Sequence, residues 1–244
     1  MAGPILHIVA DADHLDRVSA DLVTEVIAAT PTARIVVATG RTPMGLYASL
    51  AARYRMGLLD TSSITVHQLD EYLGLAPADG SSLFGWMRRS FLEPLGVPEE
   101  RVVRLPHEGD LSAACAAFDG ALDARGPLDL AVLGLGPNGH LGFNEPPSDP
   151  TSATRVVELS PMTIESNARY WGADAQVPAT ALTMGMRHIL SAGRIVLLVS
   201  GASKHQIVHR ALEGPVGPDV PASFLQQADG DVDVIVDRAA WGEG

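Results

Sequence analysis

The sequence predicts an α/β fold: a three-layer, Rossmann-like α/β/α arrangement around a mostly parallel central sheet. Three observations support this. Short runs of β-branched apolar residues recur along the chain, stretches with helical spacing separate them, and most runs are apolar throughout instead of alternating with polar residues. Strands that are apolar on both faces need cover on both faces, and helices supply it in parallel sheets.

Seven segments fit strands: residues 5–10, 35–39, 64–69, 102–105, 128–133, 195–200 and 232–236. Helical spacing marks residues 13–29, 81–91, 111–125 and 204–212. A further helix is expected to begin with Thr42 as its N-cap and Pro43 in its first position, because a hydroxyl followed by proline is typical of helix starts.

We expect one domain over residues 1–244, because no linker or internal repeat interrupts the pattern. Residues 145–176 lack clear strand character and are rich in Pro, Ser, Thr and Asn, with a short helix expected over 161–169. An excursion of this length between two central strands is more often functional than idle. We therefore predict a lid over about 145–185.

Composition excludes several partners. The chain is 46% hydrophobic and 19% charged, as in globular proteins, and its net charge of −12 argues against nucleic acid. A small phosphorylated substrate remains compatible, since a few local cations and backbone N–H groups suffice to bind it. No apolar run is long enough for a bilayer and no secretory signal is evident, so we expect no membrane partner and a cytoplasmic location.

Four polar motifs follow predicted strands, where ligands gather in open α/β sheets. They are Thr39–Pro43 (TGRTP), Asp70–Tyr72 (DEY), Gly134–Glu145, and Ser200–Lys204 (SGASK). TGRTP offers Gly40, Arg41 and Thr42 as an anion cradle, and SGASK places Lys204 in a first helical turn, where a cation opposes the helix dipole unless an anion is bound. The DEY carboxylates fit either a general base or a plain helix-start signal.

The run GLGPNGHLGFNEP (134–146) is the most informative of these motifs. An imidazole such as that of His140 suits acid–base chemistry, and Glu145 can orient it, with Asn138 beside them. The GxGxxG spacing at Gly134, Gly136 and Gly139 does not open a long helix, so we discount a dinucleotide. The histidine spacing and the single cysteine also give no metal motif.

Three segments closely resemble the signature segments of glucosamine-6-phosphate deaminases: LDEYLGL (69–75), GLGPNGHLGFNEP (134–146) and QVPATALTMG (176–185). The resemblance runs from about residue 35 to 236. It implies a fold shared with 6-phosphogluconolactonases and conversion of glucosamine 6-phosphate and water to fructose 6-phosphate and ammonia, without a metal or redox cofactor. His140 would open the sugar ring, Asp70 would move a proton from C2 to C1, and Glu145 would support His140.

The resemblance also implies that Thr42, Arg169 and Lys204 bind the phosphate, together with backbone groups of Gly40 and Arg41. Asn138 stands where some relatives carry Asp, so we expect an orienting amide there instead of an acid. The family includes monomers and hexamers, so the oligomeric state stays open, with a small homo-oligomer as our expectation. Three alternatives also remain: a lactonase, a deaminase for another hexosamine 6-phosphate such as galactosamine 6-phosphate, and a non-catalytic sugar-phosphate sensor.

Overall fold

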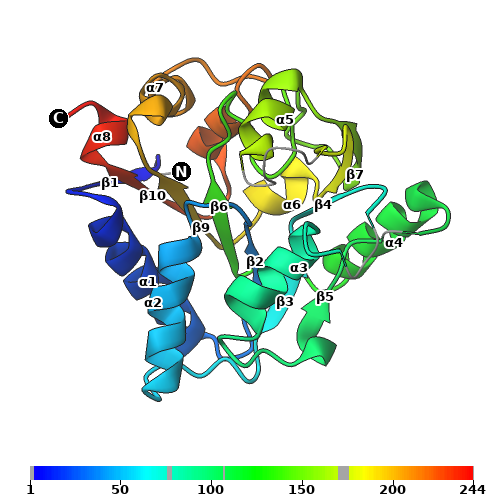
Figure 1. Cartoon of the computed structure of the whole chain (residues 1–244), viewed down its shortest axis with the longest axis horizontal. Helices are drawn as coiled ribbons and strands as arrows, with labels where there is room; N and C mark the ends of the chain where they lie inside the picture. The colour runs from blue at the N-terminus through cyan, green and yellow to red at the C-terminus, as the bar shows by residue number, and fades with distance from the viewer. Residues whose placement is uncertain (1–2, 76–78, 107, 170–175, 244) are drawn as a thin grey trace.

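The computed structural model describes residues 3–75, 79–106, 108–169 and 176–243. Its centre is a seven-stranded sheet in the order β1-β10-β9-β6-β2-β3-β5, with every neighbouring pair parallel (Figure 1). The strands are β1 (Ile5–Val9), β2 (Arg34–Val37), β3 (Thr65–Gln68), β5 (Val102–Val103), β6 (Leu130–Gly134), β9 (Arg194–Val199) and β10 (Asp231–Asp237). Each coincides with a strand predicted from the sequence, within two residues at either end.

Helices cover both faces of this sheet, which confirms the three-layer prediction. One apolar core joins it to α1 (Ala12–Ala29), α2 (Met44–Arg55), α3 (Leu83–Met87) and a π-helical turn, Arg88–Leu92. The opposite core contains α4 (Leu111–Asp123), α6 (Met186–Leu190), α7 (His205–Leu212), the 3-10 helix Pro221–Gln227 and α8 (Arg238–Trp241). Within β6, Leu130 and Val132 enter the first core while Ala131 and Leu133 enter the second, so the strand is apolar on both faces.

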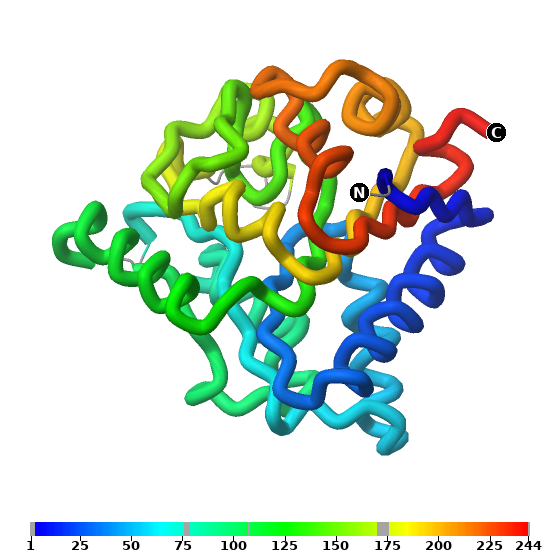
Figure 2. Tube along the Cα trace, turned by 180° about the vertical axis from the view of Figure 1, so that it is seen from behind, coloured from blue at the N-terminus to red at the C-terminus, as the bar shows by residue number. Residues whose placement is uncertain are grey.

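The strand order reverses between β2 and β6. From β2 the chain moves outward through β3 to β5, then returns to β6 on the other side of β2 and continues through β9 to β10. At the far edge, β10 pairs with β1, so the first and last strands of the chain lie side by side (Figure 2). The crevice at the carboxyl ends of β2 and β6 is therefore the expected ligand site of such a sheet.

A second, three-stranded sheet was not predicted. It is antiparallel, in the order β4-β8-β7, and consists of β4 (Asp70–Tyr72), β8 (Thr180–Thr183) and β7 (Arg155–Glu158). The expectation that residues 145–176 contain no strand was therefore wrong, because β7 lies within them. The helix expected there is present as α5 (Pro161–Ala168), whereas residues 170–175 of the predicted lid lie outside the described residues.

The predicted start of α2 was also wrong. Pro43, not Thr42, is the N-cap, and no side chain of the cap itself bonds to the helix. Asp16 of α1 takes that role by accepting a hydrogen bond from the backbone of Leu46. Its carboxylate packs so closely on Gly45 that a Cβ there would overlap it. A contact between helices thus replaces the local cap, and Thr42 faces the site described next. Among the described residues, no helix is long and apolar enough to cross a membrane.

Candidate active site

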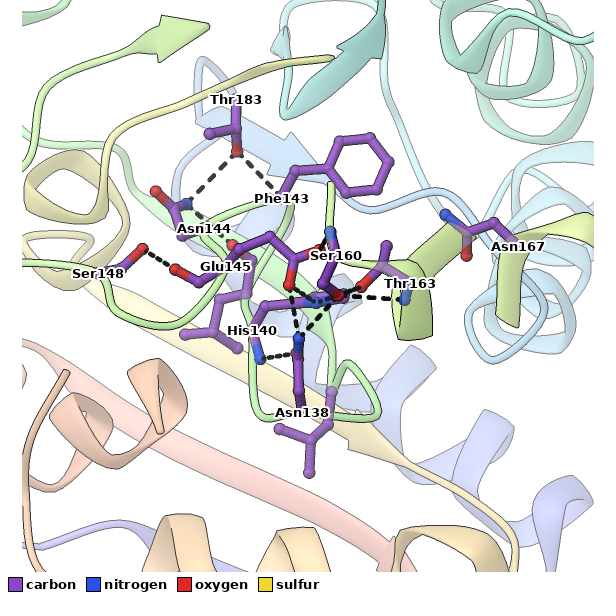
Figure 3. A network of polar contacts seen from close by, with 12 residues as sticks. Asn138, His140, Phe143, Asn144, Glu145, Ser148, Ser160, Thr163, Asn167 and Thr183 are labelled. Atoms are coloured by element: carbon purple, nitrogen blue, oxygen red, sulfur yellow. Dashed lines mark hydrogen bonds and ion pairs between the residues drawn. The ribbon is translucent and has the colours of Figure 1, made fainter. Parts of the chain in front are cut away.

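A cavity opens at the carboxyl ends of β2, β3, β6 and β9, where the four polar motifs meet. Five of the predicted site residues line it: Gly40, Arg41, Thr42, Asp70 and His140, with Lys204 from the loop after β9 as a sixth. A second hollow adjoins it and shares Arg41, Thr42 and Lys204; its lining also contains Arg169, Ser200 and Ser203 and the carboxylates of Asp16 and Glu165. Asn138 and Glu145 line neither hollow and lie next to His140 (Figure 3).

Asp70 sits where the chain leaves the central sheet and enters the second one. It is the first residue of β4 and lies opposite Thr183 of β8. The side chain is 7% exposed. Burial, and then the charge of Glu71, raise the pKa of Asp70 to about 8. A carboxylate with a raised pKa is a stronger base than an ordinary one, which suits removal of a proton from carbon.

Glu71, next to it, serves the structure instead. Its carboxylate accepts hydrogen bonds from the backbone N–H groups of Leu83 (2.8 Å) and Phe84 (2.9 Å) at the start of α3, and from that of Tyr72 (2.9 Å). The side-chain amide of Gln68 donates a fourth, at 2.9 Å. The two functions predicted for the DEY carboxylates therefore belong to different residues. Glu71 anchors the start of α3, and Asp70 lines the cavity.

His140 is held by a tight turn after β6. The N–H of Gly136 donates to the carbonyl of His140 at 3.0 Å, and Gly139 turns the chain with φ of 88°. Imidazole Nδ1 lies 3.4 Å from Thr163 Oγ1 and 3.6 Å from Glu145 Oε2 (Figure 3). Burial would raise the pKa of Glu145, but contacts with His140, Thr163 and Asn138 outweigh it and lower that pKa to about 2. Glu145 is thus a permanent anion beside the imidazole.

Asn138 orients this group in a way the sequence did not reveal. Its amide Nδ2 donates to Glu145 Oε2 at 2.5 Å, while its Oδ1 accepts from the backbone N–H of His140 at 3.3 Å. Asn138 thus contacts the carboxylate of Glu145 and the backbone of His140 (Figure 3). Asn138 therefore fixes the spacing between His140 and Glu145.

The cations lie mainly toward the outer hollow. Lys204 borders both hollows, and its Nζ donates to the carbonyl of Leu135 at 2.6 Å. Burial lowers the pKa of Lys204 to about 8. Arg41 and Arg169 are exposed and line the outer hollow from opposite elements, the loop after β2 and the end of α5. Three cations outnumber the two carboxylates of this hollow, Asp16 and Glu165, and an excess of positive charge suits a phosphate group.

Comparison with known proteins places the chain in a family. Residues 10–234 match the model of the family described as glucosamine-6-phosphate isomerases/6-phosphogluconolactonase. The chain belongs to this family. Glucosamine-6-phosphate deaminase 2 of Bacillus subtilis is 40% identical over 233 residues, which cover 93% of this chain and 92% of the relative. The deaminase of Streptomyces coelicolor is 40% identical over 96% of this chain and 90% of its own length.

Solved structures agree on the fold. A structure described as a monomeric glucosamine-6-phosphate deaminase superposes with a TM-score of 0.92 at 36% identity, covering 98% of this chain and 99% of that one. A 6-phosphogluconolactonase from Leishmania guyanensis superposes with a TM-score of 0.77 at 21% identity, covering 100% of this chain and 99% of that one. At that identity the lactonase likeness concerns the fold alone.

Several residues of this family member's cavity were missed from the sequence. Tyr72 and Asn167 both line it, and Asn167 Nδ2 donates to Tyr72 Oη at 2.8 Å, which joins α5 to β4 across the site. Thr163, next to His140 Nδ1, was also missed. Tyr72 lies within the LDEYLGL signature, so its place in that segment was an available signal. Asn167 and Thr163 give no signal without the position of α5.

The described residues, 3–75, 79–106, 108–169 and 176–243, contain no cluster of three or more His, Cys, Asp or Glu side chains suited to hold a metal ion. A reaction without a metal or cofactor stays a prediction.

The close packing of His140 on Gly136 gives a testable prediction. A Cβ at Gly136 would lie 2.2 Å from Cδ2 and Nε2 of the imidazole, so Gly136→Ala must displace the ring or the turn. Displacement of a reacting group by about 1 Å costs roughly a hundredfold in rate. We expect a loss of kcat/KM of this size, measured in a steady-state ammonia assay with the substrate for which the deaminase relatives are named.

Gly120→Ala is the matched control. Gly120 is exposed within α4 and its Cβ would meet no atom within 4 Å, so this variant should gain about 0.5–1 kcal/mol of stability and keep wild-type kinetics. Wild-type kcat/KM in Gly136→Ala would contradict the placement of the imidazole.

Proposed function

We propose that this chain catalyses the deaminating isomerisation of glucosamine 6-phosphate to fructose 6-phosphate and ammonia. The observation that carries the proposal is that one cavity brings together a buried carboxylate, Asp70, and a separately held imidazole, His140, with cations beside them. The deaminases of known sequence that are about 40% identical over nearly the whole chain support it. So does the close superposition on a deaminase of known structure.

The chemistry divides between the two groups. His140 moves the proton that opens the pyranose ring, and Glu145 stabilises the imidazolium that forms when it accepts one. Asp70 then removes the proton from C2 of the open chain and returns it to C1, while O1 gains a proton and the C2 nitrogen loses one, which converts the aldose amine to the imine of the ketose. Water adds to C2 of this imine, the C2–N bond breaks, and ammonia leaves. One carboxylate suffices for two adjacent carbons on the same face.

The phosphate supplies the positioning. We assign its binding to Lys204, Arg169 and Thr42, with Arg41 and the backbone of Gly40 and Arg41. Binding energy from this remote group holds the reacting carbons against Asp70, which is how a substrate's non-reacting part accelerates a reaction. A cytoplasmic location and a small homo-oligomer stay predictions. Size-exclusion chromatography with light scattering measures the oligomeric state. A monomer, as in the relative described as monomeric, would contradict the homo-oligomer.

The function is tested by incubating the purified protein with glucosamine 6-phosphate, with galactosamine 6-phosphate, and with 6-phosphogluconolactone in parallel. We expect ammonia and fructose 6-phosphate from the first, at a higher kcat/KM than any ammonia from the second. Lactone hydrolysis above the spontaneous rate, without ammonia release, would refute the proposal in favour of the lactonase alternative. Phosphate-dependent binding without turnover of any of the three would favour a sensor.

Replacement of the base is the sharpest test of the role of Asp70. Asp70→Asn keeps the shape of the side chain and removes its basicity, so kcat should fall by about 10²–10⁴-fold, the usual contribution of a positioned base. The affinity for inorganic phosphate should stay near the wild-type value, because Asp70 does not line the outer hollow. Exchange of the C2 hydrogen with deuterated solvent reports the proton step directly. Exchange retained at the wild-type rate would remove Asp70 from this step.

The pH dependence of kcat/KM follows from two shifted groups. Asp70 must be ionised to act, and its pKa is raised to about 8, so the rate should rise with pH up to that value. Lys204 must be charged to bind phosphate, and its pKa is lowered to about 8, so the rate should fall above it. We expect a narrow maximum near pH 8 in a pH series of kcat/KM.

Two variants separate the limbs of this profile. Glu71→Gln removes the neighbouring charge that raises the pKa of Asp70 and should move the acid limb to lower pH. Lys204→Arg keeps its charge at all working pH values and should remove the alkaline limb. A flat profile between pH 6 and 9 would contradict both assignments.

A further inference from the structure

The carboxylate of Asp237, at the end of β10, lies beside the loop after β9 but forms no part of either hollow. It is 4% exposed and accepts hydrogen bonds from two separate segments. Oδ1 accepts from the N–H of Ala240 at 2.7 Å, which caps α8. Oδ2 accepts from Ser200 Oγ at 2.5 Å, and the N–H of Gly201 points between the two oxygens at 3.0 and 3.1 Å.

This set of partners is more than a helix cap requires. One backbone N–H satisfies an N-cap side chain, and a neutral Ser or Thr serves that purpose. Within the described parts of the chain, no lysine, arginine or histidine pairs with Asp237, although a buried carboxylate is costly without strong partners. The additional hydrogen bonds all come from Ser200 and Gly201, which indicates a role in holding their loop.

The loop in question carries the buried cation of the site. Gly201 has φ of 93°, so the chain turns sharply there, and the 3-10 turn Ala202–Lys204 follows directly. The direction of that turn determines where Ser203 and Lys204 point. Because the N–H of Gly201 and the hydroxyl of Ser200 both donate to Asp237, neither is left to donate to a ligand. Ser203 and Lys204, which face the outer hollow, are the side-chain donors that remain in the loop.

We propose that Asp237 is the positioning residue of the phosphate loop, residues 200–204, and sets its affinity for the substrate's phosphate without touching the substrate. This rests on the proposed function, since it takes the outer hollow as the phosphate site. The same carboxylate caps α8, so the C-terminal helix and the phosphate loop share one anchor (Figure 1 shows α8 beside α7).

Asp237→Asn tests this. Asn caps helices as well as Asp does, so α8 is kept, but one acceptor oxygen and the charge facing Ser200 and Gly201 are lost. We expect KM for glucosamine 6-phosphate and Kd for inorganic phosphate to rise about tenfold, the equivalent of about 1.4 kcal/mol, with kcat within about twofold of wild type. Asp237→Ser supplies a hydroxyl that can also cap α8 and should weaken phosphate binding at least as much. It replaces the Asn variant if that variant does not fold.

Asp233→Asn is the matched control. Asp233 is a buried carboxylate on the same strand, 2% exposed, but it pairs with His7 at 2.7 Å and Arg194 at 2.8 Å, away from both hollows. This variant should lower Tm while leaving phosphate affinity at the wild-type value. Equal weakening of phosphate binding by the Asp233 and Asp237 variants would assign the effect to stability and overturn the proposal. Wild-type phosphate affinity in folded Asp237→Asn and Asp237→Ser would overturn it as well.

Phosphate binding is measured by calorimetry on the protein without turnover, so the two proposals fail separately. Wild-type protein that binds phosphate but releases no ammonia would refute the proposed reaction, and the phosphate affinities of the variants would still decide the role of Asp237. Wild-type protein that turns over the substrate normally, with no difference in KM between wild type and Asp237→Asn, would refute the positioning role alone.

Discussion

The buried carboxylate of Glu71 holds together the three parts of the chain that position the base. Gln68 reaches it from the end of β3, Tyr72 lies on β4, and Leu83 begins α3. Four N–H donors on two oxygens satisfy the hydrogen-bonding capacity of this buried carboxylate. Its charge then acts on Asp70, one residue away, and makes that carboxyl harder to ionise. Glu71 therefore positions Asp70 and adds to the effect of burial, which is the larger cause of the raised pKa of Asp70.

The second sheet connects this base to the imidazole. Thr183 of β8 lies opposite Asp70 in the antiparallel ladder, and its hydroxyl accepts a hydrogen bond from the backbone of Phe143, three residues after His140. Asn144, fully buried, adds hydrogen bonds from its amide to the carbonyls of Leu141 and Met184. The loop that carries His140 and the strand that carries Asp70 are thus bound to the same short strand, which explains how side chains distant in sequence keep a fixed separation.

The central sheet was predictable from sequence because most of its strands are apolar throughout, a pattern typical of a sheet covered on both faces. The small sheet was not, since Asp70–Tyr72 and Arg155–Glu158 are short and rich in charge, and their strand character comes from pairing with Thr180–Thr183. The start of α2 was misplaced for a related reason: Asp16, on another helix, replaced the local Thr42 cap.

Among the site residues, the motif positions brought Asp70, His140 and Lys204 to one cavity. The contacts of Asn138 and of Asp237 depend on distances that spacing along the chain does not contain.

The two pKa shifts in the cavity oppose each other, and the proposed substrate is suited to relieve both. The site holds a carboxyl whose pKa is raised, Asp70, and an ammonium whose pKa is lowered, Lys204. Glucosamine 6-phosphate carries an anion at C6 and an amine, protonated in water, at C2. Its phosphate favours the charged form of Lys204, and its ammonium favours the charged form of Asp70. A sugar phosphate without an amine would satisfy only Lys204, and a protonated amino sugar without a phosphate would satisfy only Asp70. Selectivity for a substrate with both charges then follows from the burial of two opposite groups in one site, in a chain whose net charge of −12 otherwise repels phosphate.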